Sequence, residues 1–292
     1  MNERVRALKV QYDTDAYLVV EDIIPPTLLA RLQQETRSAI DRVAAGTLDH
    51  ELLDTFENAD GVPQLRRIAS PEAFASCFDE AMRLPALLDL VQVLLGGSVR
   101  FDHGKLNFKP PSGGAAVEWH QDWAFYPQTN DDMLAVGILL EDCTLESGPL
   151  MVVPGSHTGA VHDHHHNGYF VGGVNAEDIR DEIQRAVPLT ATAGSISVHH
   201  VRTLHASTAN RSAVNRPLLL FNYVAVDAFP VFHSFNWDDF NERILRGEIT
   251  HTARVCEAPV RIPSPTPKPA DEYATGSLFD LQTGMAGALY AN

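Results

Sequence analysis

Two histidines and one aspartate are the residues of this chain whose types and spacing could hold a metal ion. His120 and Asp122 lie two positions apart in a segment that reads as a strand, so both side chains would point to the same side. About one His-x-Asp pair is expected by chance in a chain with 13 histidines, so the pair needs support. His205 supplies it, at the end of a second strand-like run. Two imidazoles and one carboxylate around one centre form the facial triad of non-haem Fe(II) oxygenases, which leaves positions open for an oxidant and a co-substrate.

Arg216 follows His205 after a stretch of small polar residues and could bind an anion in the same site. Its planar guanidinium could hold the far carboxylate of a dicarboxylic acid through two parallel hydrogen bonds. A surface arginine at the turn before Pro217 is the competing interpretation, and the residues alone leave both open.

Helices are predicted in the first third of the chain. The apolar residues of 26–45 and 85–95 recur at helical spacing, and Gly46 and Gly96 follow these runs where a C-cap glycine belongs. Residues 47–70 are weakly patterned, and we expect a loop with a short helix there.

From about residue 99 the pattern changes to short apolar or alternating runs that Gly, Pro, Asn and Asp clusters separate, which is typical of an antiparallel sandwich or barrel. Regular helices do not alternate with these runs, which argues against a parallel α/β sheet. We therefore predict one domain, 1–292, that is mainly β with flanking helices. A helical N-terminal layer (1–98) should pack on a β core (99–226), followed by a C-terminal helix that ends at Gly247 and a Pro-rich extended arm (227–292).

Composition and charge limit the partners. The chain has 292 residues, with 22 Lys+Arg against 38 Asp+Glu and a net charge of −16, which repels nucleic-acid backbones and anionic membranes at long range. We find no signal peptide and no apolar run near the roughly 18 residues of a membrane span. The three cysteines lack a pairing pattern, which fits a reducing compartment. We expect a cytoplasmic monomer or homodimer that acts on a small molecule, without nucleic-acid or membrane partners.

Residues 99–226 resemble the phytanoyl-CoA dioxygenase family of Fe(II)/2-oxoglutarate oxygenases. Four stretches carry the resemblance in the family's order and spacing: KLNFKPP from Lys105, WHQDW from Trp119, ESGPLMVVPGSH from Glu146 and LHASTANRSAVNR from Leu204. The resemblance implies a double-stranded β-helix, a cupin-like jelly roll, with His120, Asp122 and His205 as iron ligands.

The same resemblance implies contacts to the co-substrate. Arg216 matches the arginine that pairs with the distal carboxylate of 2-oxoglutarate. Ser207 matches a hydroxyl contact, and Lys105 falls where the family has another contact to the co-substrate. The chain departs from the family at Ile138, where the family has a tryptophan beside the co-substrate. A further basic contact near the N-terminus could be Arg66 or Arg67.

Other histidines compete with or surround the predicted ligands. His200 lies five positions before His205 and has the opposite strand parity, so both cannot face one metal from a regular strand. The resemblance favours His205 over His199 and His200, and we expect His200 to be a packed neighbour of the site. The His162–His166 tract is expected in a solvated loop, with a lid over the substrate or a separate metal site as the alternatives.

Residues 160–185 and the C-terminal arm are expected to shape the substrate pocket. Trp123, Phe125 and Tyr126 would either line the pocket or pack in the core. Gln121 should point away from Asp122, and we assign it no role.

The reaction that the resemblance implies couples oxidative decarboxylation of 2-oxoglutarate by O2, with release of succinate and CO2, to oxidation of a C–H bond. Ascorbate would be a supporting reductant in vitro. Halogenating relatives have a small residue in place of the aspartate, so Asp122 favours hydroxylation, with desaturation or cyclisation open. No Lys-rich site for CoA phosphates is evident, so an acyl-CoA substrate is not expected. Two other classes stay open: a cupin-type metalloenzyme that has the triad without need of Arg216, and a non-catalytic metabolite-binding jelly roll.

Overall fold

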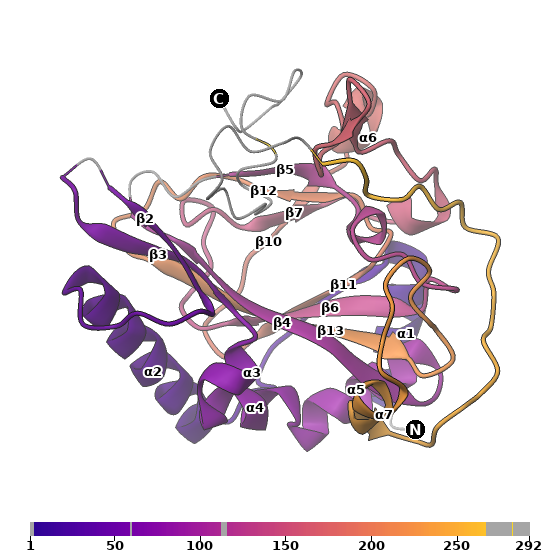
Figure 1. Cartoon of the computed structure of the whole chain (residues 1–292), viewed down its shortest axis with the longest axis horizontal. Coiled ribbons are helices and arrows are strands. Elements are labelled where there is room, and N and C mark those ends of the chain that lie inside the picture. The colour runs from indigo at the N-terminus through magenta and orange to yellow at the C-terminus, as the bar shows by residue number, and fades with distance from the viewer. Residues whose placement is uncertain (1–2, 59, 112–115, 267–281, 283–292) are drawn as a thin grey trace.

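The computed structural model describes residues 3–58, 60–111, 116–266 and 282. Two antiparallel sheets face each other, and a layer of helices covers the outer face of the larger sheet (Figure 1). The large sheet contains eight strands: β1 (Tyr17–Val20), β2 (Leu53–Glu57), β3 (Pro63–Ala69), β4 (Val99–Lys109), β6 (Met133–Leu139), β11 (Ile196–His200), β13 (Arg216–Ala225) and β14 (Ile244–Arg246). Its order is β1-β11-β6-β13-β4-β3-β2, with β14 also paired to β4.

The small sheet has four strands in the order β10-β7-β12-β5. These strands are β5 (Val117–His120), β7 (Leu150–Val152), β10 (Val187–Leu189) and β12 (His205–Ser207). A separate two-stranded ribbon pairs β8 (His165–His166) with β9 (Tyr169–Phe170). The predicted mainly β architecture with flanking helices is therefore observed.

The helices belong mostly to the N-terminal third. They are α1 (Glu3–Asp15), α2 (Pro26–Ala44), α3 (Pro71–Phe74), α4 (Ser76–Met82), α5 (Pro85–Leu95), α6 (Arg180–Ile183) and α7 (Trp237–Glu242), with 3-10 turns η1 (Asp122–Ala124) and η2 (Ser156–Thr158). The predicted helices at 26–45 and 85–95 are confirmed. Gly96 adopts a left-handed C-cap with φ of 78°, and Gly46 has φ of 66°, which a residue without a Cβ adopts at little cost.

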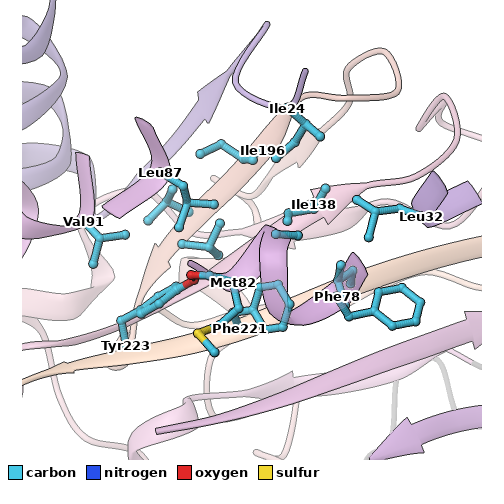
Figure 2. Packing of buried hydrophobic residues seen from close by; sticks show 14 of the residues in the cluster. Ile24, Leu32, Phe78, Met82, Leu87, Val91, Ile138, Ile196, Phe221 and Tyr223 are labelled. Carbon is cyan, nitrogen blue, oxygen red and sulfur yellow. The ribbon is translucent and has the colours of Figure 1, made fainter. Parts of the chain in front are cut away.

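The main hydrophobic core lies between these helices and the large sheet. Leu32, Phe78 and Leu87 from the helices pack against Ile138 and Phe221 from the central strands, and all five side chains are fully buried (Figure 2). Each such side chain contributes about 1.5–3 kcal/mol when it leaves water. This core fixes one face of the central strands, so alternate residues of the same strands must point toward the small sheet.

The opposite, inner face of the large sheet carries most of the polar residues of the central strands. Because Leu219, Phe221 and Tyr223 of β13 pack in the helix-side core, Leu220 and Asn222 point inward. The uniformly apolar run of β13 thus reflects burial on both faces, since helices cover one side and the small sheet the other.

Two predicted elements differ from the structure. Residues 47–70 contain the β2–β3 hairpin, whose strand β3 pairs with β4 through Arg67↔Asn107, rather than a loop with a short helix. The N-terminal layer is therefore not purely helical, because β1, β2 and β3 join the large sheet. The local sequence pattern does not reveal these strands because β3 is held by pairing with β4, which is distant in the sequence.

The helix predicted to end at Gly247 is shorter than expected. It ends at Glu242, and Ile244–Arg246 form strand β14 along the edge of β4. Gly247 has φ of 84° and lies so close to Ser98 that a Cβ would be 1.9 Å from the Ser98 hydroxyl oxygen, so the chain turns there only with glycine.

The C-terminal arm is extended as predicted through residue 266, and the rest of the expected arm, apart from Gln282, lies outside the described residues. It runs along one side of the molecule as the yellow trace (Figure 1). The Trp123 indole nitrogen donates a hydrogen bond of 2.9 Å to the Pro259 carbonyl and so attaches the arm to the β core. Within the described ranges, no helix is both long and apolar enough to cross a bilayer.

Candidate active site

His120, Asp122 and His205 converge at the end of the small sheet. His120 ends β5 and is paired directly with His205 of β12, with ring centroids 4.0 Å apart. Asp122 is not on the predicted strand but opens the turn η1, which brings its Oδ1 to 3.9 Å from His120 Nε2. One ligand atom from each of the three residues lies within 4.8 Å of the others. The residues expected to share a centre are therefore together, although a turn and not strand alternation positions the carboxylate.

Backbone carbonyls orient both imidazoles. His120 Nδ1 donates to the Glu118 carbonyl at 2.7 Å, and His205 Nδ1 donates to the Thr203 carbonyl at 2.8 Å. Each proton is thus on Nδ1, which leaves Nε2 with a lone pair for a metal. Burial lowers the pKa of His120 to about 4 and the pKa of His205 well below its usual value, so both rings are neutral near pH 7. This is the donor set that a divalent transition metal requires.

The carboxylate of Asp122 is held in its charged form. Burial by itself would raise its pKa, but the hydrogen bond from His199 and the charge of Lys105 lower the pKa well below its usual range. His199 Nε2 lies 3.3 Å from Asp122 Oδ2, and the Tyr126 hydroxyl lies 3.4 Å from Oδ1. The two oxygens of the Asp122 carboxylate thus have different hydrogen-bond partners: His199 at Oδ2 and Tyr126 at Oδ1.

The expected neighbour of the site, His200, is the wrong histidine of the pair. Its ring packs against Tyr12 and His157 on the opposite side of β11, at centroid distances of 6.2 and 5.3 Å. His199 points inward instead, and its ring is tilted against that of His205 with the centroids 4.4 Å apart. The parity argument separated His200 from His205 correctly but gave no reason to prefer it over His199 as a neighbour.

A cluster of positive charge lies on the same inner face, at the end away from His120, Asp122 and His205. Arg216, 4% exposed, begins β13 and directs its guanidinium at the Ser147 and Gly148 carbonyls. Lys109, 3% exposed, is its strand partner in β4, and its Nζ donates to the Ser207 hydroxyl at 2.8 Å. Burial lowers the pKa of both groups, and Arg216 further lowers that of Lys109. Within the described ranges neither cation has a carboxylate within ion-pair distance, which suits an anionic ligand.

Sequence reasoning missed Lys109, although it lies in the KLNFKPP stretch. The available signal was its spacing of four from Lys105, which places both side chains on one face of β4. Four residues of strand separate them by about 13 Å, so they serve different ends of the site. Lys105 Nζ is 3.3 Å from the Tyr126 hydroxyl and therefore lies at the end with the predicted metal ligands, away from Arg216.

Close packing explains why the ESGP segment has a glycine at position 148. Gly148 has φ of 77°, and a Cβ there would lie 2.5 Å from the Thr208 carbonyl oxygen. The absence of a side chain lets the loop after β12 approach the turn whose carbonyls hold Arg216.

A cavity connects the two ends between the sheets. Its walls come from the inner faces of β4, β6, β11 and β13 and from β5 and β12. The lining includes Lys105, Lys109, His120, Asp122, Ala135, His199, His205, Ser207, Arg216, Leu218 and Leu220. Asp122 is the sole carboxylate in the described lining, whereas three cations face the cavity.

Of the positions that the resemblance singled out, Ile138 lies away from the cavity, and the two basic candidates differ in their surroundings. Ile138 packs in the helix-side core (Figure 2), on the face of β6 opposite Ala135, so it does not border the cavity. Of the two basic candidates, Arg67 is paired with Asn107 of the inner face and lies 3.5 Å from Asp54. Arg66 instead lies over the Phe56 ring at 5.3 Å.

The His162–His166 tract is not a wholly solvated loop. His164 is buried, its Nε2 accepts a hydrogen bond from the Gln121 backbone at 2.8 Å, and burial lowers its pKa to about 3. Gln121, for which no role was expected, joins this segment to the site through its side chain, which bonds Ala160 and Arg202 carbonyls and the His162 amide. No sequence signal indicated this, because glutamine at a strand end is common.

Residues 160–185 contact the site without bordering the described cavity. Phe170 packs edge-on against Phe125 at 5.0 Å, and Phe125 in turn packs against His120 at 5.7 Å. Gln282 links the C-terminal region to β5, the strand that ends at His120, since its Oε1 accepts a hydrogen bond from the Glu118 backbone amide at 2.9 Å. Their expected influence on the substrate stays a prediction.

Comparison with known proteins gives a consistent result. The model of the family described as phytanoyl-CoA dioxygenase (PhyH) matches residues 12–218. A probable alpha-ketoglutarate-dependent hypophosphite dioxygenase of Stutzerimonas stutzeri is 33% identical over 287 residues, which cover 96% of this chain and 98% of that protein. The L-proline trans-4-hydroxylase of Streptomyces griseoviridis is 31% identical over 242 residues, or 76% of this chain and 87% of the relative.

Among solved structures, EctD from S. alaskensis with bound Fe superposes with a TM-score of 0.65 at 26% identity and covers 77% of each chain. The expected jelly-roll fold is confirmed by this similarity. The expected enzyme class, an iron- and 2-oxoglutarate-dependent dioxygenase, is confirmed by the relatives. With a family model over most of its length and a relative at one-third identity from end to end, this chain belongs to the phytanoyl-CoA dioxygenase family.

Proposed function

We propose that His120, Asp122 and His205 hold Fe(II) and that the chain, as one oxygenase domain, oxidises a small molecule with 2-oxoglutarate and O2. The observation that carries this proposal is the buried set of two neutral imidazoles and one charged carboxylate, each ring fixed by a backbone carbonyl. Iron bound there would supply the activation of O2. The net reaction inserts one oxygen atom into a substrate bond to hydrogen and leaves the other in succinate, with release of CO2.

The residues of the chain bind and orient the reactants. Arg216 would pair with the distal carboxylate of 2-oxoglutarate, and the Ser207 hydroxyl would donate to it. Support comes from their burial, their position along one cavity and the lack of an acidic partner for Arg216 among the described residues. Lys105 would add a positive charge at the end near Asp122, where the keto acid end of the co-substrate would lie. The buried walls would keep water away from the reacting atoms.

Asp122 favours oxygen insertion by keeping a protein carboxylate at the metal. His199 and Tyr126 hold its two oxygens, so it would present one oxygen in a fixed direction. Hydroxylation of a C–H bond is the principal candidate, in line with the similarity to a proline hydroxylase.

Oxidation of a P–H bond is the second candidate. It is favoured by the end-to-end similarity to the probable hypophosphite dioxygenase, which covers nearly all of both chains. A panel of C–H and P–H compounds with succinate as the readout distinguishes the two.

Anaerobic addition of Fe(II) and 2-oxoglutarate tests the site itself. We expect a visible metal-to-ligand charge-transfer band for the wild type and for the distant surface variant Lys9→Met. Asp122→Asn should weaken the band by reducing metal binding, whereas Arg216→Leu should raise the 2-oxoglutarate concentration needed for it by about 30-fold or more. A wild-type protein that binds iron but gives no band with 2-oxoglutarate would instead be the cupin-type metalloenzyme.

The cellular setting is part of the same proposal. Three free cysteines fit a reducing cytoplasm, and two of them are buried. The protein would work there as a monomer or homodimer on a small molecule, and its acidic charge disfavours nucleic-acid and membrane partners.

A further inference from the structure

Asn222 is a buried polar residue that the proposed chemistry does not use. Its side chain is 1% exposed, and neither its amide nitrogen nor its amide oxygen has a hydrogen-bond partner among the described residues. Buried polar groups in folded proteins are nearly always paired, so each exception calls for a reason. Asn222 lies in the middle of β13, whose backbone is paired on both sides, so its conformation does not explain the asparagine.

The strand register places Asn222 beside the predicted metal centre. Across the large sheet, His199 is paired with Ala135, Ala135 with Asn222, and Asn222 with His103, all on the inner face. Adjacent strands are about 4.8 Å apart, so the backbones of His199 and Asn222 are separated by about 10 Å, with Ala135 as the intervening residue of the sheet. This small side chain leaves room for a compact group next to His199, which contacts Asp122.

Lys105 adds a positive charge to the same place. It is paired with Leu220, two residues before Asn222, which makes Lys105 and Asn222 diagonal neighbours on one face of adjacent strands. An ammonium group has three donors, and among described residues the hydrogen-bond partner of Lys105 is the Tyr126 hydroxyl. No carboxylate of the described chain lies within ion-pair distance of it, so a donor remains for an anion even if the co-substrate takes another.

We propose that the Asn222 amide and the Lys105 ammonium form the substrate subsite and bind a compact oxyanion, either a carboxylate or a phosphorus oxyanion. The amide N–H groups would donate to the anion and the ammonium would balance its charge. Ala135 and Lys105, the direct and the diagonal strand neighbours of Asn222, line the cavity at the end away from Arg216 and Lys109. The subsite would therefore border the end with the predicted metal ligands, whereas the distal carboxylate of the co-substrate would bind at the other end. This inference rests on the proposed function, since it names the substrate class of that site.

Asn222→Leu is the informative variant because it is close in size and removes the polar atoms. If Asn222 serves a ligand, replacing an unpaired buried amide by an apolar group should raise the melting temperature of the ligand-free protein while weakening anion binding. An asparagine with a purely structural role would give the reverse for stability. Asn222→Asp keeps the size and adds a negative charge, so it should bind anions more weakly still.

The binding test uses calorimetry under nitrogen, with protein loaded with Fe(II) and 2-oxoglutarate. The probes are acetate, hypophosphite and the neutral acetamide, which has the shape of acetate. The wild type should bind at least one of the two anions, and the anion that it binds shows whether the subsite takes a carboxylate or a phosphorus oxyanion. It should bind acetamide at least about tenfold more weakly than that anion. Asn222→Leu should weaken anion binding about tenfold or more, whereas the nearby Ser197→Ala should change it less than about twofold.

Two results would overturn the subsite: anion affinity unchanged in both Asn222 variants, or acetamide bound as tightly as the anions. In each case the visible band with 2-oxoglutarate is recorded on the same samples. A normal band with no Asn222 effect rejects the subsite alone, whereas absence of the band in the wild type rejects the proposed function.

Discussion

Lys109 Nζ lies 2.8 Å from the Ser207 hydroxyl, and both side chains face the cavity end where Arg216 begins its strand. The lysine is buried, and its second acceptor is the Thr208 carbonyl. The hydroxyl that the resemblance assigns to the co-substrate is thus itself oriented by an ammonium group. Two cations and one hydroxyl together would recognise one carboxylate.

Replacing Lys109 by Met should therefore weaken 2-oxoglutarate binding. Loss of a buried charge next to the distal carboxylate should raise the dissociation constant about tenfold or more. The anaerobic charge-transfer titration measures this, and Lys9→Met is the surface control. An unchanged titration for Lys109→Met would show that the lysine only supports the fold.

Lys109 should also link co-substrate binding to proton uptake. Burial and the charge of Arg216 lower its pKa in the free protein, whereas a bound carboxylate would raise it again. The complex then holds more protons than the free enzyme, so affinity for 2-oxoglutarate should fall as pH rises above the lowered pKa. Calorimetry in buffers of different ionisation enthalpy at mildly alkaline pH should detect the uptake in the wild type and not in Lys109→Met. Equal heats in all buffers for both proteins would contradict it.

His199→Leu, which removes the donor, tests how the carboxylate is held. Without the hydrogen bond from His199 Nε2, Asp122 loses its fixed orientation, and Fe(II) affinity should fall about 10- to 100-fold. Competition with a chelator under nitrogen measures the affinity. His200→Leu is the matched control, since the adjacent ring lies on the other side of β11 and its replacement should leave iron binding unchanged. Equal losses in both variants would indicate a general effect on the strand.

The pattern of apolar residues predicted those strands whose alternation is visible in the local sequence. The stretch read as VRFDHGKLNFK is strand β4 residue for residue, because its alternation reflects a helix-side core and a polar inner face. His205 and Arg216 could be placed from their order along the chain, since β12 and β13 follow one another across the two sheets.

Features that depend on distant neighbours could not be predicted in this way. Strands β2 and β3 form because β4 offers an edge, and Ile244–Arg246 join the same strand from the far end of the chain. The choice of His199 over His200 depends on which face of β11 the helices cover, which no local pattern records. The role of Lys109 becomes evident only when Arg216 is its strand partner.

Ile138→Ala should affect stability and not the co-substrate. Its side chain is fully buried between β6 and the helices, so truncation should cost about 2–5 kcal/mol of unfolding free energy. Chemical denaturation measures the loss, and the charge-transfer titration should be unchanged. Ala135→Leu, on the opposite face of the same strand, should instead fill the cavity and weaken ligand binding. A strong effect of Ile138→Ala on 2-oxoglutarate affinity would instead indicate that residue 138 lies beside the co-substrate, as the tryptophan of the family does.

The buried His200 should make the fold sensitive to mild acid. Burial lowers its pKa to about 3, with the charges of His157 and Arg202 acting in the same direction and that of Asp131 opposing them, whereas the unfolded value is about 6.5. Between these values the unfolded chain binds a proton that the folded protein does not, so stability is full above pH 6.5 and falls as pH decreases. The contribution from this residue is at most about 1.4 kcal/mol per pH unit. Urea unfolding of metal-free protein at pH 7 and pH 5 should therefore show a smaller loss for His200→Gln than for the wild type, and identical losses would mean that His200 is protonated in the folded state.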